Sequence, residues 1–294
     1  MERIRNIISA LGVSLNVFAA EPFRTEEDGT AYQVWKLTTD RGAMVLKKTT
    51  AKERAVYETF FADGGPVPEV YAFGTCEGET WMLMEFVPGQ TMSRCTRKRL
   101  VAALDALMGC QEKWWGNETH THVGCGYSDS LPKLKKRTPY MGDLEDAYLA
   151  FLDEYENTPR TLCNDDMLPF NVLATDDRAV ILDWEYGGIL PYASSLARFL
   201  AFGEEEGEMF QMSDEDRDFA LSYYYENLIS TRGISRAEFD RTMALFFFKE
   251  YSEWVYCAGV SGDFEMEYYK KYGKMAKNLA LSLGLMKEKG GAEC

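Results

Sequence analysis

Three side chains that could serve phosphoryl transfer lie close together in the sequence. The segment "TLCNDDMLPFNVL" places Asp166 five residues before Asn171, and the segment "AVILD" then ends in Asp183. Transfer of a γ-phosphoryl group needs a cation on the nucleotide phosphates, oxygen ligands for Mg²⁺, and a carboxylate that receives the proton of the acceptor hydroxyl. Carboxylate and asparagine oxygens are the hard ligands that suit Mg²⁺. The spacing therefore predicts Asp166 as the base, with Asn171 and Asp183 as metal ligands.

The elements before about residue 87 are expected to be strands with one helix. The segment "AYQVWKLTT" alternates apolar and polar side chains, and "AMVLKK" follows after the turn Asp40-Arg41-Gly42, which predicts a β-hairpin. The segment "AKERAVYETFFADGG" predicts a helix that ends at its two glycines. Two more strands, joined by a Glu-Gly turn, are expected in "PVPEVYAFGTCEGETWMLMEFV".

Helical patterns dominate after the segment "PGQT". The segment "RKRLVAALDALMGCQEKW" carries an apolar stripe at helical spacing, and "GDLEDAYLAFLDEYEN" is a second helical segment. Short strands are expected at 172–173 and 180–182, next to the acidic motif. We predict an α+β bilobal fold, with a strand-rich lobe over 1–87 and a larger helical lobe over 88–294.

Composition limits the classes of partner. The 294 residues include 47 acidic and 32 basic ones, a net charge of −15, so a nucleic acid or an anionic membrane surface is a poor partner. The seven cysteines are odd in number and form no CxxC pair, which favours a reducing, cytoplasmic location without disulfides or a zinc site. His120 and His122 could share a strand face as metal ligands, but a plain loop is the expected structure because no Cys or carboxylate cluster accompanies them.

The N-terminal segment "MERIRNIISALGVSLNVFAAEPF" has two interpretations. Its basic start and apolar stretch are loosely similar to a signal peptide. Ile4, Ile8, Leu11 and Leu15 nevertheless recur at helical spacing with polar residues between them, which favours an amphipathic helix. No apolar run in the sequence is long enough to span a membrane.

The combined motifs resemble those of the aminoglycoside phosphotransferase family of small-molecule kinases. The family pattern His-x-Asp-x-x-x-x-Asn, with a proline two residues before the asparagine, matches "NDDMLPFN" except that Asn164 stands in the histidine position. The family segment of an apolar residue followed by Asp-Trp-Glu matches "ILDWE" around Asp183. The resemblance implies a protein-kinase-like fold and an enzyme that requires Mg²⁺ together with ATP or GTP.

The resemblance also implies a nucleotide site in the first lobe. Lys47 in "GAMVLKK" would hold the nucleotide phosphates, with Lys48 on the other face of the strand. Glu53 would pair with Lys47, and Glu58 is a weaker alternative. The carbonyl of Glu85 and the amide of Val87 would contact the adenine in the connection between the lobes. A loop over the phosphates is expected around 28–30, although it lacks a GxGxxG pattern.

Two departures from the family pattern bear on activity. Asn164 can donate and accept hydrogen bonds as a histidine does, but it does not fill the volume of the ring. Ser194 or Ser195 stands where the family commonly has an aspartate that bonds back to the catalytic loop. Because Lys47, Asp166, Asn171 and Asp183 are all present, activity is expected to be retained.

Two segments of the helical lobe could bind the acceptor. An acidic segment that includes Glu204 and Glu205 could bind a polycation, although a charge run can also be a solvated surface. The segment "LFFFKEYSEWVY" carries Glu250, Glu253 and Trp254, which could cradle an amine, or it could form a buried helix.

The acceptor and the oligomeric state stay open at this point. The acceptor prediction is a hydroxyl of an aminoglycoside-like or other cationic amine, which would make the chain a candidate antibiotic-resistance enzyme. A kinase for a metabolite such as choline or homoserine is an alternative. A nucleotide-binding pseudokinase with a regulatory or structural role is the alternative from a different class. The sequence does not distinguish a monomer from a dimer.

Overall fold

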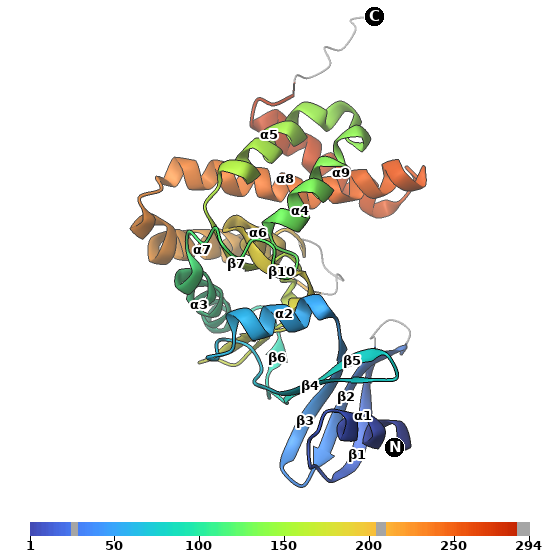
Figure 1. Cartoon of the computed structure of the whole chain (residues 1–294). Helices are drawn as coiled ribbons and strands as arrows, with labels where there is room; N and C mark the ends of the chain where they lie inside the picture. Colours follow the sequence, from blue (N-terminus) through green and yellow to red (C-terminus); the bar gives the residue numbers. More distant parts are fainter. Residues whose placement is uncertain (25–28, 204–209, 287–294) are drawn as a thin grey trace, which may run out of the picture.

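The structure is a computed structural model that describes residues 1–24, 29–203 and 210–286. A smaller lobe built on a five-stranded sheet adjoins a larger, mainly helical lobe (Figure 1). The described strands are β1 Val17–Arg24, β2 Ala31–Thr39, β3 Gly42–Thr49, β4 Val70–Cys76, β5 Glu79–Glu85, β6 Gln90–Thr91, β7 Arg160–Asn164, β8 Val172–Ala174, β9 Ala179–Ile181 and β10 Gly187–Pro191. The described α-helices are α1 Glu2–Ala10, α2 Ala51–Phe60, α3 Arg97–Trp114, α4 Tyr127–Lys135, α5 Glu145–Asn157, α6 Ala193–Leu200, α7 Asp214–Tyr224, α8 Arg236–Ser261 and α9 Glu267–Ser282. Short 3₁₀ or π segments complete the elements: η1 Thr138–Tyr140, η2 Gly142–Leu144, η3 Pro169–Asn171, η4 Trp184–Tyr186, η5 Tyr225–Ile229 and η6 Ser230–Arg232. The predicted α+β bilobal fold is confirmed.

The sheet of the smaller lobe is antiparallel, with strand order β1-β2-β3-β5-β4. The predicted β2–β3 hairpin forms, with Thr39 opposite Gly42. The predicted turn between β4 and β5 also forms, and the positive φ angles of Glu77 (53°) and Gly78 (79°) are those that a two-residue hairpin turn with the twist of its strands requires. Strand β1 was not predicted, because Pro22 interrupts its pattern, and it lies at the edge of the sheet where proline is tolerated.

Alternating side chains of β3 and β5 divide the smaller lobe between two cores. One core packs the isoleucines of α1 against one face of the sheet, and it contains Met44, Leu46, Trp81 and Leu83. The intervening residues Val45, Met82 and Met84 belong instead to the large core that also contains α2 and the helical lobe. Because side chains alternate along a strand, Lys47 points to the same side as Val45, toward the helical lobe. The expected amphipathic N-terminal helix is present as α1.

Two small sheets of the larger lobe frame the acidic motif. Strand β7 pairs antiparallel with β10, with Asn164 opposite Gly187, and β8 lies between β6 and β9. A Cβ atom at Gly188 would stand 2.6 Å from the backbone nitrogen of Gly126, so only glycine admits the loop before α4 this close to β10. The segment from 160 to 171 is thereby held as a strand, a turn and the short helix η3.

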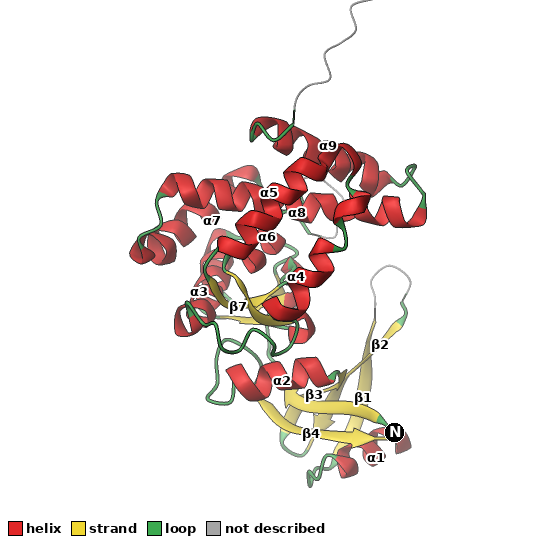
Figure 2. Ribbon diagram, turned by 45° about the horizontal axis from the view of Figure 1, so that its top comes forward, coloured by secondary structure: helices red, strands yellow, loops and turns green. Residues whose placement is uncertain are grey.

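Helix α8 brings the C-terminal part of the chain to the same place. It begins with a capping box between Ser235 and Glu238 and ends at Gly262 in the left-handed conformation. Along its length it packs against α5, α6 and α9, and Figure 2 shows it crossing the helical lobe. Its middle residues thus face α6, which follows β10 directly in the chain.

Two negative findings hold for the described residues. No helix among residues 1–24, 29–203 and 210–286 is long and apolar enough to cross a membrane. The six cysteines in these ranges are free thiols. His120 lies in a loop, where its ring packs against the rings of Phe60 and Trp114 at centroid distances of 6.0 Å and 5.6 Å.

Candidate active site

Lys47 links the two lobes through two carboxylates. Its Nζ donates to Oε1 of Glu53 over 2.7 Å and to Oδ1 of Asp183 over 2.9 Å. Glu53 is buried on α2, and its second carboxylate oxygen accepts a 2.7 Å hydrogen bond from Thr49. Burial opposes the charge of Lys47, but the two carboxylates outweigh it and raise the pKa of this lysine. The ammonium is therefore charged at neutral pH and is aimed at the space between the lobes.

The two alternatives for this ion pair are placed elsewhere. Glu58 is exposed on α2, where it pairs with Arg54 at 2.8 Å. Lys48 points to the opposite side of β3 from Lys47, as expected, and its Nζ donates to Glu79 over 2.6 Å. The partner of Lys47 is thus Glu53, as expected, although only six positions separate the two residues in the sequence.

Asp183 adopts an unusual backbone conformation between β9 and η4. Its φ of 54° and ψ of 70° are left-handed, a region that a residue with a Cβ atom enters at a cost of about 1–3 kcal/mol. The side-chain amide of Asn164 donates to the carbonyl of Asp183 over 2.9 Å and to the carbonyl of Leu182 over 3.1 Å. These bonds hold the carboxylate-bearing residue in its turn.

Asn164 also fixes the loop that follows it. Its Oδ1 accepts a 3.0 Å hydrogen bond from the backbone N–H of Asp166. The hydroxyl of Ser195 accepts from the backbone N–H of Asn164 over 2.7 Å and donates to its carbonyl over 3.0 Å. Both departures from the family motif are therefore placed where they brace this loop, with fully buried side chains.

Asp166 lies in the turn between β7 and η3, within reach of two donors. Arg198 of α6 donates to its Oδ1 over 3.1 Å. The side-chain amide of Asn171 donates to the carbonyl of Asp166 over 2.8 Å and to its Oδ2 over 3.3 Å. Burial raises the pKa of Asp166, although the charge of Arg198 opposes the rise. A carboxylate with a raised pKa is a better proton acceptor, as a general base requires.

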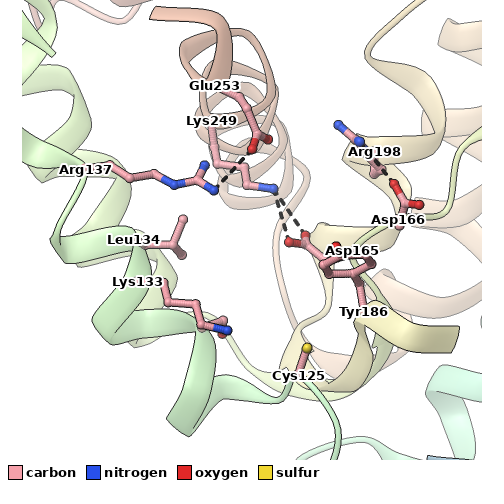
Figure 3. A pocket seen from close by; sticks show the side chains of 11 residues that line it. Cys125, Lys133, Leu134, Arg137, Asp165, Asp166, Tyr186, Arg198, Lys249 and Glu253 are labelled. Carbon is pink, nitrogen blue, oxygen red and sulfur yellow. Dashed lines mark hydrogen bonds and ion pairs between the residues drawn. The ribbon is translucent and has the colours of Figure 1, made fainter. Parts of the chain in front are cut away.

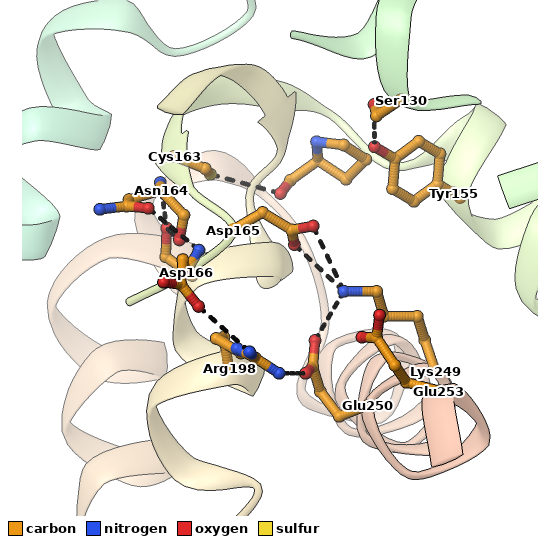
Figure 4. A network of polar contacts seen from close by, with 12 residues as sticks. Ser130, Tyr155, Cys163, Asn164, Asp165, Asp166, Arg198, Lys249, Glu250 and Glu253 are labelled. Atoms are coloured by element: carbon orange, nitrogen blue, oxygen red, sulfur yellow. Dashed lines mark hydrogen bonds and ion pairs between the residues drawn. The ribbon is translucent and has the colours of Figure 1, made fainter. Parts of the chain in front are cut away.

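A chain of alternating charges connects the two aspartates of the motif (Figure 4). Arg198 donates to Glu250 over 3.0 Å, Glu250 pairs with Lys249 at 2.8 Å, and Lys249 reaches Asp165 at 3.2 Å. Burial works against the charge of Lys249, but Asp165 and Glu250 prevail and raise its pKa. Glu250 is thus buried between two cations.

Sequence reasoning did not single out Arg198 or Lys249. Their only local signal is a basic residue inside an apolar helical segment, "SSLARFLAF" or "LFFFKEY". Buried basic residues are almost always paired with carboxylates, so this signal predicts an ion pair but does not name the partner. Arg198 lies 32 residues after its partner Asp166, and Lys249 lies 84 residues after its partner Asp165.

Asn171 and Asp183 are the residues that could hold a metal. The amide nitrogen of Asn171 is used by Asp166, which leaves its oxygen as the free ligand atom, and the backbone carbonyl of Asn171 accepts from the N–H of Leu182, next to Asp183. Within the described ranges no group of three His, Cys, Asp or Glu side chains could hold a metal. Two oxygen ligands fit Mg²⁺, which proteins bind through one or two carboxylates together with phosphate oxygens.

A cavity of about 460 Å³ opens beside Asp166 (Figure 3). Its wall is formed by Cys125, Ser130, Lys133, Leu134, Arg137, Asp165, Asp166, Tyr186, Arg198, Lys249 and Glu253. The volume is in the range of pockets that bind small molecules. The carboxylate of Asp166 therefore faces a space that is large enough for a small molecule.

Of the described residues predicted to bind the acceptor, Glu253 alone lies on the wall of this cavity. Glu253 lies on the wall and pairs with Arg137 at 3.1 Å. Trp254 stacks on Tyr268 with ring centroids 4.5 Å apart, and it is not among the residues of the wall. Glu250 is not on the wall, but it pairs with Arg198 and Lys249, which are. Glu204 and Glu205 lie outside the described residues.

The predicted adenine contacts lie at the junction of the lobes. Glu85 is the last residue of β5, where its backbone N–H donates to the carbonyl of Glu69 over 2.8 Å. Val87 follows in the connection to β6. Of the expected phosphate loop, Gly29 has a φ of 70° and Thr30 precedes β2, whereas residue 28 lies outside the described ranges.

The bilobal arrangement, with a lysine–glutamate pair in a five-stranded lobe and an acidic loop in a helical lobe, is that of the kinase-like fold. A family model described as "Phosphotransferase enzyme family" (APH) matches residues 22–221. The match covers more than half of the chain, so the protein belongs to this family of phosphotransferases. The predicted family and enzyme class are thereby confirmed.

Solved structures agree with this fold at low sequence identity. Choline kinase LicA from Streptococcus pneumoniae has a TM-score of 0.64 and 14% identity, covering 96% of this chain and 98% of that one. Aminoglycoside phosphotransferase APH(4)-Ia, as a ternary complex of a thermostable mutant with ADP and hygromycin B, has a TM-score of 0.59, 15% identity and 99% coverage of both chains. Choline kinase from Cryptosporidium parvum Iowa II has a TM-score of 0.61, 12% identity and 97% coverage of both chains. No curated protein matches the chain in sequence.

Proposed function

We propose that the protein transfers the γ-phosphoryl group of ATP or GTP to a hydroxyl of a small molecule, with Mg²⁺ as cofactor. The observation that carries this proposal is the convergence of two groups from separate lobes. Lys47 and Glu53 come from the smaller lobe, and Asp166, Asn171 and Asp183 come from the larger one. Lys47 bonds directly to Asp183, which brings the cation for the phosphates next to the ligand for the metal.

In the proposed reaction, the acceptor hydroxyl oxygen forms a bond to the γ-phosphorus while the bond from that phosphorus to the β–γ bridging oxygen breaks. The nucleoside diphosphate leaves with the electron pair of that bond, and the hydroxyl proton passes to Asp166. Arg198 and Asn171 orient the carboxylate of Asp166 for this step. Lys47 binds the α- and β-phosphates, and backbone groups of Glu85 and Val87 bind the adenine or guanine ring of the nucleotide.

Mg²⁺, bound through the Asn171 oxygen and the Asp183 carboxylate, would neutralise charge on the phosphates. The carboxylate of Asp183 is held for this role by the bonds of Asn164 to its backbone. We infer that the smaller lobe, residues 1–87, binds the nucleotide and that residues 88–294 supply the base and the acceptor site.

The pseudokinase alternative is motivated by Asn164 and the serines at 194 and 195. The hydrogen bonds of Asn164 and Ser195 within the catalytic loop support activity, because they supply the bracing that these departures put in question. A pseudokinase would bind nucleotide but would not consume it in response to an alcohol.

The acceptor predicted from the sequence is a cationic amine, and choline or homoserine are alternatives. Similar folds are found in choline kinases and in an aminoglycoside phosphotransferase complex with hygromycin B, which supports a cationic acceptor by analogy of fold alone. Resistance to aminoglycosides in cells that express the chain would support this prediction directly.

The test of the proposed function is nucleotide consumption with a panel of alcohols of different charge. We expect at least one alcohol to increase ADP or GDP formation, and we expect Asp166→Asn to lower that rate about 10²-fold to 10⁴-fold while nucleotide affinity is kept. The matched control is Asp176→Asn, an exposed aspartate in the loop between β8 and β9. Full turnover in Asp166→Asn would contradict the assignment of the base, and nucleotide binding without any acceptor-dependent turnover would favour the pseudokinase.

A further inference from the structure

The cavity beside Asp166 differs in charge from the chain as a whole. Acidic residues outnumber basic ones by 47 to 32 in the sequence. The wall of the cavity has the opposite balance, with four basic side chains against three acidic ones. The basic residues are Lys133, Arg137, Arg198 and Lys249, and the acidic ones are Asp165, Asp166 and Glu253. A polycationic acceptor would need a surplus of carboxylates on this wall, because like charges facing each other in a site are repulsive.

Only two of these basic side chains are explained by the catalytic loop. Arg198 bonds to Asp166 and Lys249 bonds to Asp165, so both offset the charge of the motif. Lys133 and Arg137 belong to α4 and to the residues just after it, and they reach the cavity from the other side (Figure 3). Lys133 and Arg137 therefore have some role other than neutralising the two aspartates of the loop.

Arg137 is held in place and keeps donors for a ligand. Its Nη2 pairs with Glu253 at 3.1 Å, and its guanidinium lies 4.9 Å from the ring centroid of Tyr256. A guanidinium has five N–H donors, so an ion pair through one nitrogen leaves capacity for a second anion. A planar guanidinium that is already ordered matches a carboxylate or phosphate group and loses little freedom on binding it.

Lys133 adds a second cation on the same side of the cavity. Its Nζ donates to Asp129 over 2.8 Å, and its side chain is 59% exposed. An ammonium group has three donors. Asp129 is shared with Lys52 of α2, at 2.5 Å, so this carboxylate already serves two cations and offsets the charge of Lys133 only in part.

We infer that the acceptor is a small alcohol that also carries an anionic group, held by Arg137 and Lys133 while its hydroxyl meets Asp166. This inference rests on the proposed phosphotransferase function and differs from the cationic acceptor predicted from the sequence. A carboxylate and a phosphate ester share the chemistry that these two side chains recognise. The roughly 460 Å³ of the cavity is suited to a single sugar-sized molecule of this class.

The test uses alcohols of matched skeleton that differ in the charge of one substituent. One series is glycerate, glycerol and 3-aminopropane-1,2-diol, and the other is glucuronate, glucose and glucosamine, which share a pyranose ring. Glycerol 3-phosphate is added to distinguish a phosphate from a carboxylate, and choline and hygromycin B represent the cationic acceptors of the relatives. We expect kcat/KM for the anionic member of at least one series to exceed that of its neutral and cationic members by tenfold or more.

Glu253 separates the two acceptor classes in a single variant. It neutralises Arg137, so Glu253→Gln frees the guanidinium, and we expect the KM of an anionic acceptor to fall about threefold to tenfold. If Glu253 instead binds a cationic acceptor, the same change raises the KM for amino alcohols or hygromycin B. Arg137→Met and Lys133→Met are expected to raise the KM of the anionic acceptor about tenfold, with the KM of the nucleotide unchanged.

Lys98→Met, an exposed lysine of α3 that pairs with Asp176 at 3.8 Å, is the matched control and should change none of these constants. Preference for choline, an amino alcohol or hygromycin B would overturn the inference and leave the proposed function in place. A raised nucleotide KM in Lys133→Met and Arg137→Met would also overturn it, because these residues would then serve the nucleotide. Failure of every alcohol, whatever its charge, would remove both the inference and the proposed function.

Discussion

The two charged clusters of this protein are built in different ways. The cluster around Lys47 uses one cation and two carboxylates, and two of its members lie only six residues apart on neighbouring elements. The cluster around Arg198 and Lys249 alternates cations and carboxylates over side chains that lie as far as 84 residues apart. The first cluster joins the two lobes through Lys47, at the place proposed for the nucleotide phosphates. The second joins the two aspartates of the motif to α6 and α8 through the buried Glu250, so its expected role is to hold that loop in place.

Removal of the lysine of the first cluster should have the largest effect. Lys47→Met removes the cation for the phosphates and leaves Glu53 buried without its partner. We expect kcat/KM for the nucleotide to fall about 10²-fold to 10³-fold, the loss typical of one preorganised electrostatic contact. Steady-state kinetics with varied ATP would measure it.

Lys48→Met is the matched control, since Lys48 lies on the same strand but pairs with Glu79 on the opposite face. Equal loss in the two variants would mean that the strand as a whole, rather than the Lys47–Glu53 pair, is responsible.

The second cluster should matter more for stability. Lys249→Met leaves the buried Glu250 with Arg198 as its remaining partner and deprives Asp165 of its cation. Removing one partner of a buried ion pair typically costs about 3 kcal/mol or more of unfolding free energy. Urea denaturation would measure the loss, with Lys270→Met as the control, because Lys270 and Glu265 form an exposed pair of little expected value.

A loss below about 1 kcal/mol in Lys249→Met would show that the second cluster contributes no more than a surface ion pair. The contrast between a cluster for binding and a cluster for stability would then disappear.

Asn164 links the two clusters, so its removal should affect rate and stability together. Asn164→Ala deletes three hydrogen bonds to partly buried backbone groups, at Leu182, Asp183 and Asp166. We expect a stability loss of about 2 kcal/mol, in the range for buried groups left unsatisfied. The drop in kcat should exceed any rise in the KM of the nucleotide, because the loop that carries the base is loosened. Asn227→Ala, at an exposed position, is the control. Unchanged kcat would refute the bracing role.

The smallest expected effect is a shift in pH dependence. The base must be ionised, so kcat/KM should fall as the pH drops through the pKa of Asp166, which burial raises above its ordinary value. Arg198 counteracts that rise, so Arg198→Met should raise the pKa further and move the acidic limb of the profile to higher pH. pH–rate profiles of the wild type and of Arg198→Met measure the shift. An acidic limb that does not move would mean that Arg198 does not influence the pKa of the group whose ionisation limits the rate.

The sequence predicted the fold and the first cluster because their signals are local. Strand alternation places Lys47 on the inner face, the helix after it supplies Glu53, and the acidic motif carries its own spacing. Strands β1, β6, β7 and β10 were missed, since Pro22 interrupts β1 and the other three are short and lie in segments that read as loops. The second cluster has no such signal, because nothing near Arg198 or Lys249 in the sequence names the carboxylates that they meet.

The left-handed backbone of Asp183 sets stability against activity at a single position. Glycine enters that conformation without a steric penalty, so Asp183→Gly should relieve strain of about 1–3 kcal/mol while it deletes the carboxylate that Lys47 contacts. Turnover of this variant should fall. Its melting temperature should fall less than that of Asp183→Ala, which also loses the ion pair but keeps the backbone strain. Glycine at 183 would fit this turn with less backbone strain, so an aspartate there is what we expect where the carboxylate has a binding role.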